Sequence, residues 1–163
     1  MTNKTVAAPY TDAKVLGAYV SSFYKLKYGR EISPIKLQKS LVFLFAYWGA
    51  FARKANSDKT IEGEYKIEYL FHNKIEAWTY GYVIPDVHNE KLTEIDFTAV
   101  NKDIEIKKFI DDMLNDILAV SDFRLVDISH EDNSWKKNYD PNAKIHNIEV
   151  KKEELINEYT AKI

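Results

Sequence analysis

The stretch that decides the fold is Ser33 to Ala55, SPIKLQKSLVFLFAYWGAFARKA. Ser33 is a good N-cap, and Pro34 would occupy the first helical position, where its missing N–H costs nothing. The apolar residues then recur at spacings of three and four, which predicts a helix; they are Leu37, Leu41, Leu44, Phe45, Trp48, Phe51 and Ala52. Because the second half is apolar nearly all round, we expect this helix to run through the middle of the core.

Helical patterns also flank this stretch on both sides. Apolar residues follow a helical stripe over residues 11–28, which Gly29 is well placed to end. A second stripe covers residues 101–121, with Asp103 as its expected cap, and a shorter helix is expected around residues 123–128. An amphipathic pattern over residues 148–163 predicts a closing helix.

The apolar period changes to two in the middle of the chain. Residues 65–71, YKIEYLF, alternate apolar and polar side chains, which predicts a half-buried strand. Residues 72–74 would then turn, and residues 75–84 would form a second extended segment or a short helical one before Pro85 ends it. The sequence therefore predicts a mainly α fold: a single compact domain over residues 11–163, with about five helices and a small β-hairpin or short extended element near the middle. Residues 1–10 are expected to be a flexible leader.

Composition narrows the class of protein. The 163-residue chain carries 23 basic and 25 acidic side chains, so no domain-wide positive field favours a nucleic-acid partner. It has no cysteine, its first residues lack the apolar run of a secretory signal, and the run from Leu41 to Ala52 is about half the length of a membrane span. We therefore expect a cytoplasmic protein with no membrane partner, and the charge balance disfavours a nucleic-acid partner without excluding a local basic patch.

Enzyme signatures are missing from the sequence. None of the five glycines lies in a phosphate-binding pattern, and there is no nucleophile elbow or HExxH motif. The local histidine–carboxylate groupings, His88 with Glu90 and His130 with Glu131 and Asp132, lack the i,i+4 spacing that places two metal ligands on one helix face. We expect no catalytic, cofactor-binding or metal-binding residues, and a small metal-dependent hydrolase built on the His130 grouping is the last-ranked alternative.

An aromatic cluster surrounds Gly81 in the sequence IEAWTYGYVIPDVHNE, residues 75–90. Gly81 suggests a positive φ or a close approach of another segment. Trp78, Tyr80 and Tyr82 combine apolar area with a polar group, a property that suits interfaces as well as cores. Their composition alone leaves a core role and an interface role equally open.

Three blocks of sequence, taken in order, resemble the Panacea domain, also described as SocA-like and as a phage-associated protein family. The blocks are ISPIKLQKSLVFLFAYW, LFHNKIEAWTYGYVIPDVHNE and LVDISHEDNSWKKNY, and the correspondence spans nearly the whole chain. The resemblance implies a mainly helical fold with a short hairpin, and a non-enzymatic antitoxin that neutralises a protein toxin of a toxin–antitoxin pair. The alternative is a phage-encoded interaction protein that acts on a host factor, as a defence inhibitor or a proteolytic adaptor.

The resemblance also marks residues for a structural network or an interaction surface. The motif positions are Lys36, Gln38, Lys39, Glu76, Trp78, Tyr80, Gly81, Pro85, His130, Glu131 and Trp135. Two residues particular to this chain, Tyr82 and His88, join them as candidates. The usual Gly-Pro-Val of the family is Gly-Tyr-Val here, which makes Tyr82 the departure.

The polar residues within these blocks suggest a buried network. We expect Glu76, His130 and Lys36 to form it, with Trp78 and Trp135 packed around it, because buried charged groups must be paired and hydrogen-bonded. Trp78 is then expected to anchor the core. Tyr82, followed by His88 to Glu90, is the place where a function particular to this chain is expected.

Overall fold

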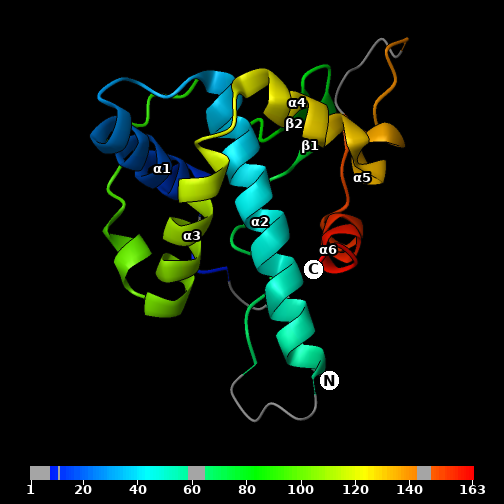
Figure 1. Cartoon of the computed structure of the whole chain (residues 1–163), viewed down its shortest axis with the longest axis horizontal. Helices are drawn as coiled ribbons and strands as arrows, with labels where there is room; N and C mark the ends of the chain where they lie inside the picture. Colours follow the sequence, from blue (N-terminus) through cyan, green and yellow to red (C-terminus); the bar gives the residue numbers. More distant parts are fainter. Residues whose placement is uncertain (1–7, 11, 59–64, 143–147) are drawn as a thin grey trace.

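The structure, a computed structural model, describes residues 8–10, 12–58, 65–142 and 148–163. These residues form six α-helices, one 3₁₀ helix and a small antiparallel sheet (Figure 1), which confirms the predicted mainly α fold with a small β element. In chain order the elements are α1 (Ala13–Tyr28), α2 (Pro34–Ser57), β1 (Glu76–Trp78), β2 (Gly81–Val83), η1 (Thr98–Asn101), α3 (Ile104–Ile117), α4 (Asp122–Glu131), α5 (Asn133–Lys136), β3 (Ile148–Glu149) and α6 (Lys152–Thr160). The single turn of α5 was not predicted as a helix.

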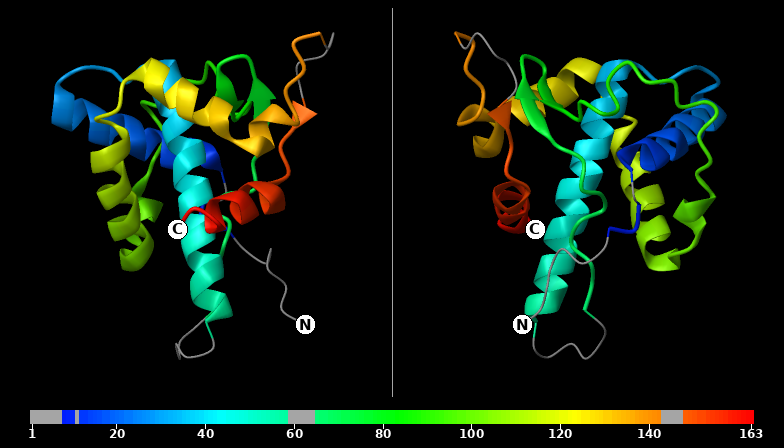
Figure 2. Two further views of the ribbon diagram at one scale, coloured as in Figure 1. Left: turned by 45° about the vertical axis from the view of Figure 1, so that its right-hand side comes forward. Right: turned by 180° about the vertical axis from the view of Figure 1, so that it is seen from behind.

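Helix α2 forms the centre of the molecule. Ser33 caps it by accepting a hydrogen bond from the backbone N–H of Lys36, and Pro34 is its first residue. Helices α1 and α3 lie on one side of α2, α6 lies on the other, and α4 crosses near its N-terminal end (Figures 1 and 2). The predicted position of this helix in the core is confirmed, since Leu41, Leu44 and Trp48 are buried.

Local sequence signals set the ends of the other helices. The side chains of Asp12, Asp103 and Ser121 accept backbone hydrogen bonds at the starts of α1, α3 and α4. Gly29 ends α1 with a φ of 71°, in the left-handed region that glycine adopts without strain. Because each of these capping residues marks a helix end in the sequence, the helix boundaries can be predicted locally.

The hairpin is shorter than the sequence predicted and lies wholly within residues 75–84. Strands β1 and β2 pair with Ala77 opposite Tyr82, and β3 adds to the other edge of β1, giving the order β2-β1-β3. Pairing with β1 keeps residues 148–149 extended, so the predicted closing helix begins only at Lys152. The apolar side chain of Val150, expected on that helix, is buried just before it.

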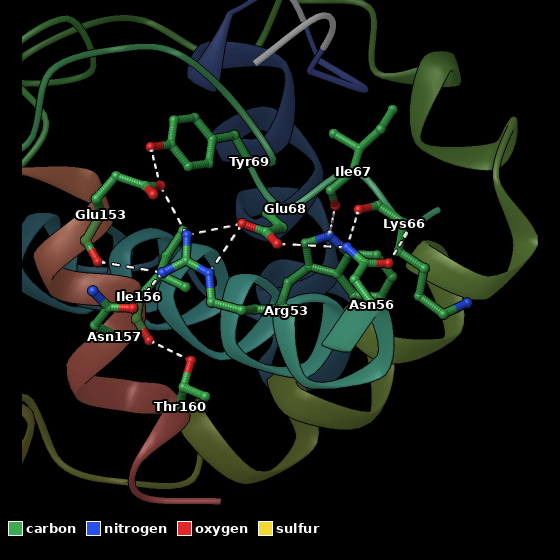
Figure 3. A network of polar contacts seen from close by, with 11 residues as sticks. Arg53, Asn56, Lys66, Ile67, Glu68, Tyr69, Glu153, Ile156, Asn157 and Thr160 are labelled. Carbon is green, nitrogen blue, oxygen red and sulfur yellow. Dashed lines mark hydrogen bonds and ion pairs between the residues drawn. The ribbon is translucent and has the colours of Figure 1, made fainter. Parts of the chain in front are cut away.

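The strand predicted over residues 65–71 does not form. This segment runs beside α2, whose side chains replace a neighbouring strand as hydrogen-bond partners: the Asn56 side chain bonds both the N–H and the C=O of Lys66, and Trp48 Nε1 donates to the carbonyl of Ile67 at 2.8 Å. The predicted alternation of burial is also absent, because Tyr65 is exposed whereas Glu68 and Leu70 are buried. At Lys66 and Ile67 the backbone bonds side chains of α2 and not a neighbouring strand (Figure 3).

A buried ion pair fastens the same segment to α2 and α6. Arg53 donates to the carboxylate of Glu68 at 2.8 and 3.1 Å, and it also reaches Glu153 and Asn157 on α6 (Figure 3). Tyr69 donates to the same Glu153 carboxylate. Because Glu68 is buried, Arg53 is needed to balance its charge.

The expected leader is only partly within the described residues. Residues 1–7 lie outside them, whereas Tyr10, which the prediction placed in the leader, is buried and donates its N–H to the carbonyl of Leu70. Ordered structure therefore begins before residue 11. Among the described residues, no helix combines the length and apolarity that crossing a membrane requires.

Candidate functional site

A cavity of about 430 Å³ opens between the first turns of α2 and the hairpin. We call it the hairpin pocket and define it by the residues that line it: Pro34, Ile35, Gln38, Lys39, Trp78, Thr79, Tyr80, Val83 and His88. Six of the residues that the sequence singled out therefore lie at one site or directly behind it, counting Gly81. A larger hollow beside α1 shares Pro34, Gln38 and His88 with the pocket, so the two adjoin.

Two adjacent residues of α2 hold the hairpin in place. The amide of Gln38 accepts from the N–H of Ile84 at 2.8 Å and donates to its carbonyl at 3.2 Å, as a neighbouring strand would. Lys39 Nζ donates to the carbonyl of Tyr82 at 2.9 Å. These contacts give the Lys-Leu-Gln-Lys block a physical role, since its side chains satisfy the backbone of β2 and of the residue after it.

Gly81 is the point where the hairpin passes between two helices. Its φ is 103°, and a Cβ built there would lie 2.8 Å from Lys39 Cε on one side and 2.8 Å from Ser129 Cβ on the other. Both expectations for this residue, a positive φ and a close approach, are confirmed. No other residue type fits this position without strain.

Helices α4 and α5 hold the turn of the hairpin. His130 Nε2 donates to the carbonyl of Thr79 at 2.9 Å, and Trp135 Nε1 donates to the carbonyl of Trp78 at 2.8 Å. The two donor rings lie against each other, with 4.1 Å between their centroids. Residues from all three sequence blocks thus converge on the hairpin.

The rim of the pocket is aromatic. Trp78 is half-buried, its ring meets the edge of His88 at 4.9 Å between centroids, and its Nε1 donates to the carboxylate of Glu76. Tyr80, at the turn, is 58% exposed. Pro85 begins the turn that brings His88 to this rim, through a hydrogen bond from the His88 N–H to the Pro85 carbonyl.

Lys39 is the one buried cation of the pocket. It is 2% exposed, and within the part of the chain that the structure describes it forms no ion pair. Burial lowers the pKa of Lys39 to about 8, because the ammonium loses its hydration and no neighbouring carboxylate offsets the loss.

The sequence predicted that Trp78 anchors the core and that Tyr82 marks the functional site, and the structure reverses these two roles. Tyr82 is fully buried, and its hydroxyl donates to Asp132, which also accepts from Tyr159 and Lys162 on the C-terminal segment. Burial, together with the Asp132 carboxylate, raises the pKa of both tyrosines. Tyr82 therefore anchors the core, whereas Trp78 lines the pocket.

The predicted network of Glu76, His130 and Lys36 is wrong. Glu76 bonds Trp78, and His130 bonds the backbone carbonyl of Thr79. Lys36 instead donates to the carbonyl of Leu118 and lies 3.5 Å from Asp122. Trp78 and Trp135, which were expected to pack around that network, instead meet through a hydrogen bond from Trp135 Nε1 to the Trp78 carbonyl.

The histidine–carboxylate grouping of the hydrolase alternative is also dispersed. His130 faces the hairpin turn, exposed Glu131 lies 3.7 Å from Arg124, and Asp132 is enclosed by its two tyrosines and Lys162. Across the described ranges, three or more histidine, aspartate or glutamate side chains do not gather as a metal site would require. The geometry gives this grouping a structural role.

Asp132 has a structural role, as the shared acceptor of Tyr82, Tyr159 and Lys162, that the sequence did not predict. Nothing in the local pattern distinguishes Asp132 from the exposed carboxylates around it, because its burial depends on the distant Tyr82 and Tyr159.

Comparison with family models, with curated proteins and with solved structures finds no match for the chain.

Proposed function

We propose that this chain is a non-enzymatic protein-binding module of the antitoxin type, which neutralises a protein toxin in the cytoplasm. The observation that carries a binding role is the aromatic rim of the hairpin pocket, where exposed Tyr80 and half-buried Trp78 border an apolar hollow. Tyrosine and tryptophan beside a pocket are the residues that most often dominate binding energy at protein interfaces.

The rim is also held rigidly. Gln38 and Lys39 fix one strand of the hairpin, and His130 and Trp135 fix its turn. A preorganised surface loses little conformational freedom on binding, which favours affinity. The toxin–antitoxin assignment itself is supported by the resemblance of the three blocks to the Panacea domain.

Co-expression tests the proposal. The gene that neighbours this reading frame is expressed from an inducible promoter, with and without the full chain, and growth is followed. We expect the neighbour to arrest growth and the chain to restore it. Tyr80→Ala and Trp78→Ala should each weaken the rescue and the co-purification of the two proteins at unchanged protein level.

Tyr65→Ala is the matched control, because Tyr65 is an exposed tyrosine outside the hairpin pocket, next to Lys66, whose backbone bonds Asn56 near the C-terminal end of α2. Rescue by this variant should equal that by the wild type. A toxic neighbour that the chain neither binds nor neutralises contradicts the antitoxin assignment. Equal loss of rescue in the Tyr65 and Tyr80 variants contradicts the assignment of the binding surface.

A further inference from the structure

The hairpin pocket has the size and lining of a ligand site. Its volume of about 430 Å³ lies within the range of cavities that hold small organic groups. Ile35, Trp78 and Val83 supply apolar walls, and no aspartate or glutamate is among the residues that line it. An apolar group fits these walls, and an anionic one meets no repulsion from them.

Within the described part of the chain, no carboxylate forms an ion pair with Lys39. An ammonium has three N–H donors, and the hydrogen bond that the structure gives it is to the carbonyl of Tyr82. A buried charge without an opposite charge destabilises a fold. The hydrogen bond to a neutral carbonyl meets part of this cost, and a bound anion would meet the rest.

The first turn of α2 adds to the positive potential of the pocket. Pro34 and Ile35 begin the helix and line the pocket, and the first turn contains no acidic residue. The N-terminal end of a helix carries a partial positive charge, so it favours an anion nearby. The Asp122 carboxylate of α4, which accepts a hydrogen bond from the Ser33 hydroxyl at this helix end, offsets part of this charge, so Lys39 is the principal cation of the pocket.

We propose that the hairpin pocket binds an apolar group that carries a carboxylate, with the carboxylate paired to Lys39 Nζ and the apolar part against Ile35, Trp78 and Val83. This chemistry is offered by a free aryl or alkyl carboxylic acid and by the C-terminal residue of a protein. The inference goes beyond the proposed function and does not depend on it, because the pocket and its charge are properties of the chain alone.

Binding of 4-phenylbutanoate, with its neutral isostere 4-phenylbutanamide as the matched ligand, tests the inference on the full chain. Isothermal calorimetry gives the two dissociation constants, and the indole N–H signal of Trp78 in NMR spectra reports occupancy of the pocket. We expect the acid to bind at least ten-fold more tightly than the amide. Equal binding of the two, or no binding of either, overturns the proposal without any variant.

Two lysine variants locate the charge. In Lys39→Met the ratio of the dissociation constant of the amide to that of the acid should fall to about one, with the affinity for the amide unchanged. Lys91→Met, which removes an exposed lysine outside the pocket, should leave the preference unchanged. A Lys39 variant that keeps the preference for the acid overturns the assignment of Lys39.

Peptides separate the two sources of the ligand. A hexapeptide that ends in phenylalanine with a free carboxylate is compared with its C-terminal amide and with 4-phenylbutanoate. Tighter binding of the free-acid peptide than of 4-phenylbutanoate supports a protein C-terminus as the natural ligand, and weaker binding supports a small acid. Measurable binding of the peptide and of its amide with the same dissociation constant contradicts the proposal. All of these measurements use the isolated protein, so their outcome is distinct from that of the toxin-rescue experiment.

Discussion

Replacing Lys39 by methionine is expected to stabilise the protein, although it removes a buried hydrogen bond. Lysine ordinarily has a pKa of 10.5, and burial lowers that of Lys39 to about 8. At about 1.4 kcal/mol per pH unit, this difference corresponds to a destabilisation of about 3 kcal/mol at pH 7. Methionine has a similar length and no charge, and the lost hydrogen bond to the Tyr82 carbonyl costs about 1 kcal/mol. We expect a net gain of about 2 kcal/mol.

The pH dependence gives the expected gain a distinct signature. Between pH 8 and pH 10.5 the Lys39 side chain holds more protons in the unfolded chain than in the folded one, so its contribution to folding stability rises with pH. The stability that is present above pH 10.5 is lost as the pH falls toward 8. The advantage of Lys39→Met should therefore be full at pH 7 and shrink to near zero by about pH 10.

Urea unfolding followed by tryptophan fluorescence, at pH 7 and at pH 10, measures both quantities for the wild type and the variant. Differences between the two proteins cancel the titration of the other lysines and tyrosines. Lys91→Met serves as the control, because Lys91 is exposed and its removal should change stability little. A destabilised Lys39 variant at pH 7, or an advantage that is the same at both pH values, refutes the reasoning.

Three further predictions concern the residues that hold the hairpin and α6. Gly81→Ala should lower the free energy of unfolding by about 3 kcal/mol, since the added methyl meets side-chain carbons at 2.8 Å and φ is 103°. Tyr82→Phe should lower it by about 1 kcal/mol in urea unfolding, because Asp132 loses one donor and keeps two others. Arg53→Met should cost about 3 kcal/mol by leaving buried Glu68 unbalanced, and adding Glu68→Gln should recover at least 1 kcal/mol.

Each of these predictions has an outcome that contradicts it. A Gly81→Ala variant as stable as the wild type would show that the hairpin can move away from α2 and α4 at no cost. Tyr65→Phe, which alters an exposed tyrosine, should change stability by less than about 0.5 kcal/mol; a change equal to that of Tyr82→Phe contradicts the role of the buried hydroxyl. A double Arg53 and Glu68 variant less stable than the single one contradicts the ion-pair argument.

Much of the helical architecture could be predicted because its signals are local. A serine or aspartate cap, a proline at the first helical position and an apolar period of three to four residues act within one or two turns of chain. For this reason the bounds of α1, α2 and α3 agree with the sequence to within a few residues. Gly81 was likewise predictable, because a glycine among aromatic residues in a strand implies close approach.

The strand pattern over residues 65–71 shows where local signals fail. Alternation predicted that Tyr65 would be buried and Glu68 exposed, and the structure has the reverse. Alternation also does not state what the backbone bonds to. Here the partners come from Trp48 and Asn56, which are 19 and 10 residues away along the chain from the groups they bond. Two segments with the same alternation can therefore be a strand in one protein and an irregular extended run in another.

The sequence by itself determined that this protein is a mainly helical domain built around Ser33 to Ala55, with a small β element near Gly81. Only the tertiary structure decided which polar residues meet: Lys39 with the Tyr82 carbonyl, Tyr82 with Asp132, and Arg53 with Glu68. The physical reason is that burial and charge balance depend on contacts between segments distant in sequence, and those contacts decide that Tyr82 belongs to the core while Trp78 and Lys39 line a pocket.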